Sequence, residues 1–215
     1  MRVSDRAWSG ATVAILASGP SLTADEAARL RGRVRAIAVN DAIRLAPWAE
    51  VLYSSDRRWW KAYGGAPWFT GAKFSIGPAR GRSDEISAWP EIHVLRHTGI
   101  EGLELASAGL RSGEHSGYAA INLAVQLGAA RIWLLGYDLA APASGPSHFF
   151  GRHPAGLPET SAPEYARFRR HYGSMLEDLA AAGVSVTNTT LGSQLEAFPR
   201  RPLGELLELE ALRCR

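Results

Sequence analysis

The chain has 215 residues, of which 46% are hydrophobic and 21% charged, and its formal net charge is +3. This composition excludes a disordered or fibrous chain and favours one globular domain over residues 1–215. A lone cysteine, Cys214, excludes a disulfide framework or a cysteine metal site within the chain. The mild positive charge favours phosphate-bearing ligands, whereas no run of basic residues marks a nucleic-acid-binding stripe.

The first apolar run, residues 11–17, ends at the turn Ser18-Gly19-Pro20-Ser21. Such a run predicts a strand buried on both faces, which is typical of a parallel sheet. It is too short to span a membrane, and we expect a soluble, cytoplasmic protein. A helix over residues 24–30 follows, capped by Ser21 or Thr23.

Strands and helices then alternate along the chain. Further strands are predicted at residues 34–40, 50–56, 73–76, 91–95, 130–136 and 184–188, and helices at 117–127, 163–182 and 203–212. The expected caps of the helix at 117–127 are Ser116 and Gly128, and Gly183 closes the next helix. The alternation predicts an α/β fold: a Rossmann-like parallel sheet flanked by helices, with a lid-like insertion around 140–163 and a C-terminal helix or tail at 203–215.

Polar residues follow several of the predicted strands. They are Ser18, Asn40, Asp41, Ser55 and Asp56. Because ligands of open α/β sheets bind outside the carboxyl ends of the strands, these side chains are candidate nucleotide contacts.

The turn at residues 17–21 is the first candidate phosphate site. A helix N-terminus offers unpaired N–H groups, Gly19 lets the backbone approach a ligand, and Pro20 stiffens the turn. Ser18 and Ser21 can donate to phosphate. The alternative is a tight strand-to-helix turn with a capping serine. The segment is neither a Walker loop nor the three-glycine dinucleotide fingerprint.

Two later segments offer similar chemistry. Ser116 and Gly117 open a helix and form a second candidate phosphate or ribose contact, or else a flexible linker with a serine cap. Gly136-Tyr137-Asp138 follows a strand, where Asp138 could accept from a ribose hydroxyl or a base, or could merely cap the next turn.

The lid carries Ser147-His148-Phe149-Phe150-Gly151-Arg152-His153. A histidine there could act as a general base, and Arg152 could clamp phosphate. A purely structural role is the main alternative. Two histidines alone do not complete a zinc site, so no metal site is predicted. Trp59, Trp60 and Trp68 favour core or lid packing over base stacking.

Taken in order, these motifs resemble one group of enzymes. They are Ile15-Leu16-Ala17-Ser18-Gly19-Pro20-Ser21-Leu22, the strand ending at Asn40, Ser116-Gly117, Ile132-Trp133-Leu134-Leu135-Gly136-Tyr137-Asp138 and the histidine loop. This order resembles the bacterial sialyltransferases of glycosyltransferase family 42. It is also similar to the broader group of motility accessory factors and archaeal-type 6-hydroxymethylpterin diphosphokinases. The resemblance extends over most of the chain.

The resemblance to the sialyltransferases implies a nucleotide-sugar donor bound without a metal or other cofactor. The implied donor contacts are Ser18, Gly19, Asn40, Ser116, Gly117, Gly136, Tyr137, Asp138, Asn188 and Ser193. His153 would be the general base, with His148 as the substitute. The chain departs from the family at Ser18, where the family has asparagine, and at Phe149 and Phe150, since the family's lid has two tyrosines.

The sequence therefore predicts a glycosyltransferase that transfers a sugar from a nucleotide-sugar donor to an acceptor hydroxyl on a glycan, a protein or a modified nucleic acid. Arg152 and a backbone-lined site would stabilise the leaving phosphate. One alternative is an ATP- and Mg²⁺-dependent diphosphokinase, with Asp41, Asp56 and Asp138 near the ion. Another is a non-catalytic nucleotide-binding module. Relatives are often oligomers, which leaves a homo-oligomer open.

Overall fold

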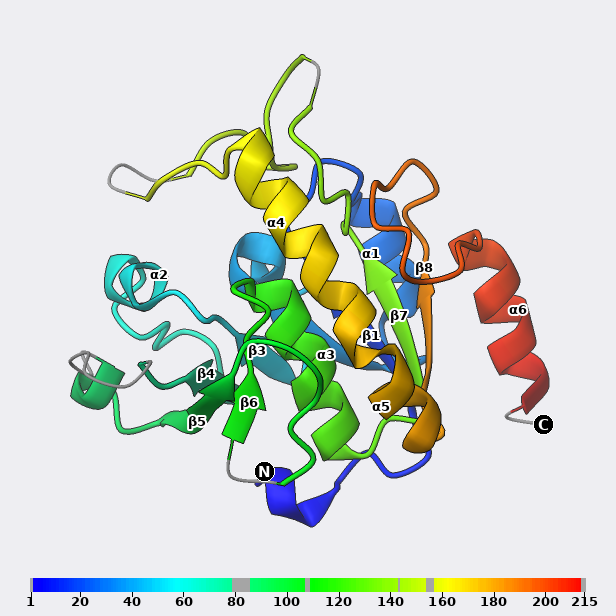
Figure 1. Cartoon of the computed structure of the whole chain (residues 1–215), viewed down its shortest axis with the longest axis horizontal. Coiled ribbons are helices and arrows are strands. Elements are labelled where there is room, and N and C mark those ends of the chain that lie inside the picture. The colour runs from blue at the N-terminus through cyan, green and yellow to red at the C-terminus, as the bar shows by residue number, and fades with distance from the viewer. Residues whose placement is uncertain (1, 79–85, 107–108, 143, 154–156, 214–215) are drawn as a thin grey trace.

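The computed structural model describes residues 2–78, 86–106, 109–142, 144–153 and 157–213. Its centre is one eight-stranded sheet in the order β6-β5-β4-β3-β2-β1-β7-β8, with every neighbouring pair parallel. The strands are β1 Thr12–Leu16, β2 Arg35–Val39, β3 Val51–Tyr53, β4 Ala72–Ile76, β5 Ile92–Gly99, β6 Gly109–Arg111, β7 Arg131–Leu135 and β8 Ser185–Asn188. The predicted Rossmann-like α/β fold is confirmed (Figure 1).

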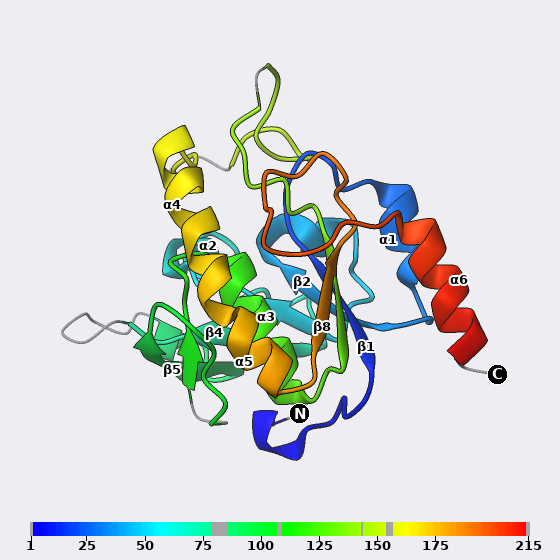
Figure 2. The ribbon, with the colours of Figure 1, turned by 45° about the vertical axis from the view of Figure 1, so that its right-hand side comes forward.

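Helices cover both faces of the sheet. The helices are α1 Ala24–Leu30, α2 Arg57–Ala62, α3 Ser116–Leu127, α4 Ala162–Tyr172, α5 Leu176–Ala181 and α6 Leu203–Arg213, with short 3₁₀ turns at Val3–Asp5, Asn40–Arg44, Ile86–Ala88 and Gly173–Met175. Figures 1 and 2 show α3, α4 and α5 on one face, with α1 on the opposite face and α6 beside it at the sheet's edge. Buried clusters on the two faces match this division.

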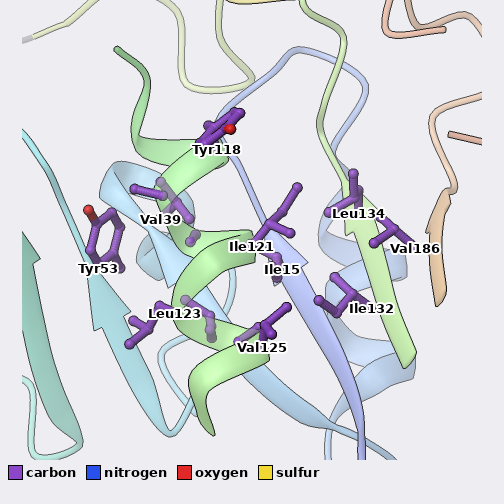
Figure 3. Close-up of a cluster of buried hydrophobic side chains, with 14 of the residues drawn as sticks. Ile15, Val39, Tyr53, Tyr118, Ile121, Leu123, Val125, Ile132, Leu134 and Val186 are labelled. Carbon is purple, nitrogen blue, oxygen red and sulfur yellow. The ribbon is translucent and has the colours of Figure 1, made fainter. Parts of the chain in front are cut away.

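Successive side chains of the central strands point to opposite faces of the sheet and so contribute to both buried clusters. In β1, Val13 and Ile15 pack toward α3, whereas Ala14 and Leu16 pack toward α1. All of α3 from its second residue to its last is buried, because the sheet lies on one side and α4 and α5 lie on the other. Figure 3 shows Ile121 and Val125 of α3 meeting strand side chains such as Ile15. Gly128 closes α3 at a φ of 104°, as predicted.

The strand order reverses at β1. Successive strands β1 to β6 extend the sheet in one direction, and the chain then crosses through α3 to place β7 and β8 on the other side of β1. The helices that follow β1 and β7, α1 and α4, therefore lie on opposite faces of the sheet, which leaves a crevice at the carboxyl edge. Such a switch point is where open α/β sheets bind ligands.

Several helices and strands differ from those predicted from the sequence. The six-residue helix α2 and the three-residue strand β6 were missed, because both are too short to show a period. Strand β5 runs to Gly99 instead of ending at Leu95.

The predicted helix at 163–182 is broken into α4, a 3₁₀ turn and α5. At the break the Ser174 hydroxyl donates to the His171 carbonyl at 2.7 Å, a local bond that competes with helical geometry.

At the C-terminal end, α6 packs Leu203, Leu206 and Leu207 onto the α1 face of the core. Cys214 and parts of the lid, residues 143 and 154–156, lie outside the described residues. Within the described residues, no helix is both long and apolar enough to cross a bilayer.

Candidate active site

A cavity of about 840 Å³ opens at the switch point. Its walls come from the turns after β1, β2 and β3, the N-terminus of α3, the loop after β7, the lid, and α4. Candidate residues in its lining are Ser18, Gly19, Pro20, Asn40, Ser55, Asp56, Ser116, Gly117, Gly136, Asp138, His148 and His153. Candidates outside the lining are Ser21, Asp41, Tyr137, Arg152, Asn188 and Ser193.

The turn after β1 is locked to the loop after β7. The Gly19 amide donates to the Gly136 carbonyl at 3.1 Å, and the Ser21 hydroxyl donates to Asp138 Oδ2 at 2.8 Å. A Cβ at position 19 would collide with the Asp138 carboxylate and the Gly136 carbonyl. The close contact between the two loops therefore requires glycine at position 19. The need for glycine here is explained by the fold itself, without a ligand that approaches the backbone.

The N-terminus of α1 is satisfied from within. Thr23 caps it, since its hydroxyl accepts from the Glu26 amide at 3.2 Å while Glu26 Oε2 accepts from the Thr23 amide at 3.2 Å. Asp25 and Glu26 add negative charge to the first turn. These groups already use the amides and the dipole that an anion would need, so α1 is a poor phosphate site.

The N-terminus of α3 is different. The prediction that Ser116 caps it is wrong: the cap is His115, whose side chain makes no capping bond, and the Ser116 hydroxyl instead accepts from the Ser55 amide at 3.1 Å. No acidic residue lies in the first turn. With Ser116 and Gly117 in the cavity wall, this helix end presents uncapped amides and positive potential to the cavity.

Asn40 is the clearest ligand signal in the cavity. It follows β2 in a left-handed conformation, φ 53°, and lines the cavity. Its Oδ1 is buried and has no hydrogen-bond partner among the described residues. A buried acceptor left in this way costs about 1–3 kcal/mol, which a ligand donor would recover.

Burial dominates the electrostatics of Asp138. It raises the pKa of the carboxyl above its ordinary value, against the lowering effect of the Ser21 hydrogen bonds. Asp138 thus lines the cavity while bracing the switch point, and the two predicted readings of this residue, ligand contact and cap, are geometrically compatible.

Two aspartates predicted at the nucleotide site have structural partners. Asp41 is fully buried on the α1 face, accepts from Trp59 Nε1 at 2.9 Å and from the Tyr63 hydroxyl, and does not line the cavity. Asp56 lines the cavity but caps α2, accepting from the Arg58 amide at 2.8 Å and its guanidinium at 2.9 Å. Trp59 and Trp60 are in the core, as predicted, whereas Trp68 is exposed.

Three further candidates lie outside the cavity lining and hydrogen-bond to the backbone near it. The buried Tyr137 hydroxyl donates to the Gly117 carbonyl at 3.0 Å and so links β7 to α3. Asn188 Oδ1 accepts from the Thr190 amide at 3.0 Å, and Ser193 donates to the Tyr137 carbonyl. None of the three lines the cavity, and their direct contact with a nucleotide stays a prediction.

The lid contacts the turn after β1. The Phe149 amide donates to the Ser18 carbonyl at 3.3 Å, and the His148 ring stacks on Phe150 at 5.0 Å between centroids. His148 and His153 both line the cavity, with ring centroids 4.2 Å apart. Arg152 is exposed and outside the lining, and its role as a phosphate clamp stays a prediction.

His115 is a cavity residue that sequence reasoning missed. Its ring packs 5.0 Å from Phe168 of α4, and its Nδ1 lies 3.2 Å from the Tyr172 hydroxyl. Burial lowers the pKa of His115 to about 4, so the ring is neutral at pH 7. Its place directly before a predicted helix start was the available signal.

Among the described residues, one group of three possible metal ligands lies close together: His148, His153 and Glu159. All three line the cavity. The sequence offered the two histidines; Glu159 joins them only in the folded chain.

No protein-family model matches this sequence, and no curated protein sequence matches it significantly. The fold does have a counterpart among solved structures. It is similar to the sialyltransferase CstII from Campylobacter jejuni, solved in complex with a substrate analogue, cytidine-5'-monophosphate. The TM-score is 0.55 and the identity 13%, over 91% of this chain and 86% of the other.

At this identity the similarity shows a shared fold. The shared fold is sialyltransferase-like. The motility accessory factors and the pterin diphosphokinases stay predictions.

Proposed function

We propose that this chain is a nucleotide-sugar glycosyltransferase whose donor nucleotide binds across the switch point. Asn40 lines a cavity of about 840 Å³, and its buried, unpaired Oδ1 is the observation that carries the proposal. A base amino group or a ribose hydroxyl would supply the missing donor. The fold shared with a sialyltransferase solved with a cytidine nucleotide supports this reading.

The donor phosphate is proposed to lie at the N-terminus of α3. The uncapped first turn there has no acidic residue, unlike that of α1. Backbone amides and the helix dipole would stabilise the charge that develops on the leaving nucleotide. Arg58 and Arg167 also line the cavity, each in an ion pair, with Asp56 and Glu114 respectively.

A lid histidine is proposed as the general base, His153 first and His148 second. The acceptor hydroxyl would lose its proton to the imidazole while its oxygen bonds to the anomeric carbon. The bond from that carbon to the phosphate oxygen breaks, and the nucleotide leaves with the electron pair. Burial and the nearby His153 lower the pKa of His148, which keeps its ring neutral and able to accept a proton.

The diphosphokinase alternative is less well supported, because two of its three candidate magnesium ligands are already in use. Asp41 accepts hydrogen bonds from Trp59 and Tyr63 and does not line the cavity, and Asp56 is paired with Arg58, which leaves Asp138 alone among the three. Magnesium needs oxygen ligands that can turn toward it.

A thermal-shift panel of nucleotides and nucleotide-sugars tests the proposal. A nucleotide present at about a hundred times its Kd adds roughly 2.7 kcal/mol to the free energy of unfolding. We expect this stabilisation to persist in EDTA, that is, without a metal ion. Stabilisation by ATP that requires Mg²⁺ would favour the diphosphokinase, and no shift with any nucleotide would overturn the proposal.

Asn40→Gly is the matching variant, since glycine keeps the φ of 53° without strain. It should weaken nucleotide binding by about tenfold, the cost of one hydrogen bond. Ala66→Gly, another left-handed position but outside the cavity lining, is the control and should bind normally.

Turnover with the donor that binds then tests the base. His153→Gln should lower kcat by at least about a hundredfold while nucleotide affinity is kept. If neither His153→Gln nor His148→Gln changes turnover, the base lies elsewhere.

A further inference from the structure

We propose that His148, His153 and Glu159 form a binding site for a divalent first-row transition-metal ion, with an open coordination position toward the cavity. The three side chains come from one segment of the lid, and their donor atoms lie within 4.8 Å of one another. Two imidazoles and a carboxylate are a ligand set that suits zinc, iron or cobalt. The inference does not rest on the proposed function, although two of the three ligands are the histidines proposed there as the general base.

The separations are close to those of a filled site. His148 Nε2 lies 3.5 Å from Glu159 Oε2. Two ligands on a tetrahedral zinc ion, at the usual bond lengths, are about 3.3 Å apart. This pair needs almost no movement. Bringing His153 from within 4.8 Å of the other two ligand atoms to that spacing needs a shift of at most about 1.5 Å.

Glu159 is already oriented for such a role. Its other oxygen, Oε1, accepts from the His153 backbone amide at 3.0 Å. This bond ties two of the three ligand residues together and turns Oε2 toward His148. Hydrogen bonds that orient a ligating carboxylate are a regular feature of metal sites.

The imidazole nitrogens have few other partners. Both ring nitrogens of His148, and Nδ1 of His153, are buried without a hydrogen bond among the described residues. Unpaired buried polar atoms are uncommon and costly, at about 1–3 kcal/mol each. A metal ion would engage one nitrogen from each ring.

The site has room for a fourth ligand. All three residues line the same cavity as Asn40 and the α3 N-terminus. Three protein ligands with one position open to a cavity is the arrangement of catalytic rather than structural zinc sites. A metal-bound nitrogen cannot take a proton, so under the proposed function a bound ion would suppress transfer.

Metal binding by the full chain is the direct test. The protein is stripped with EDTA, titrated with Zn²⁺, anaerobic Fe²⁺ and Mg²⁺ by calorimetry, and Co²⁺ is followed by its visible absorption. We expect one Zn²⁺ or Co²⁺ per chain, tetrahedral Co²⁺ bands and no Mg²⁺ binding, because Mg²⁺ prefers oxygen ligands. Tighter binding of Fe²⁺ than Zn²⁺ would identify iron as the ion.

Ligand variants separate this site from surface binding. Glu159→Gln, at a half-exposed carboxylate that should fold normally, is expected to weaken Zn²⁺ binding by at least about tenfold, as is His153→Gln. His93→Gln, at an exposed histidine on β5, is the control and should bind like the parent chain. Equal binding by all variants, or no binding by the parent, would overturn the site, and neither result depends on transferase activity.

Discussion

The helix starts of α1 and α3 show how differently the same local motif can be used. Both follow strands, both are preceded or opened by serine or threonine, and the sequence predicts a phosphate site near each. The structure closes the first with a Thr23–Glu26 capping box and an acidic turn, while the second keeps uncapped amides beside a cavity. A helix N-terminus is an anion site only where its own side chains leave it open.

The β1 turn next to α1 then has a different task, which is to hold the switch point together. Gly19→Ala should have the largest effect, because the new Cβ meets the Asp138 carboxylate and the Gly136 carbonyl. We expect a loss of about 3 kcal/mol in the free energy of unfolding, measured by urea denaturation. Gly204→Ala, inside α6 with its nearest neighbour at 3.6 Å, is the control and should be neutral or stabilising. A Gly19→Ala protein of normal stability would show that this contact is unimportant.

The α3 start is expected to respond to pH through His115. Its pKa is about 4 in the folded chain, below the ordinary value of 6.5. Between these values the unfolded chain holds a proton that the folded chain lacks, so stability falls as pH drops from 6.5 toward 4.

The His115 contribution to this loss is on the order of 2 kcal/mol. His115→Gln should remove that part of the pH dependence in urea melts between pH 7 and 4.5. Parallel stability curves for the two proteins would contradict a buried neutral ring.

The smallest expected effect is on nucleotide affinity, which should change when the start of α3 is altered and not when the start of α1 is altered. Ser116→Asp places a carboxylate in the first turn of α3, as Asp25 and Glu26 already do in α1, and should weaken nucleotide binding by about tenfold through repulsion of phosphate. Thr23→Ala, at the α1 cap, should instead cost about 1 kcal/mol of stability and leave affinity unchanged. The opposite pattern, with affinity lowered by Thr23→Ala alone, would indicate that the phosphate binds at α1.

Much of the fold was predictable from the chain. Continuous apolar runs such as β1 and β7, and turn residues such as Gly128 and Gly183, determine where strands and helices form and end, because they depend on near neighbours alone. The same local signals marked Ser18, Asn40 and Asp138 as strand-end residues, and the structure brings them to one cavity.

Only the tertiary structure decided which of these groups face that cavity. Asp41 and Asn40 are adjacent in sequence, yet the left-handed backbone at Asn40 leaves one in the cavity wall and the other buried against Trp59. His115 and Glu159 join the site through packing against α4 and through the path of the lid. The sequence by itself determined the strands, the helices and the α/β class, because local pattern governs them; strand order, cap use and side-chain convergence came from long-range packing, which no local pattern encodes.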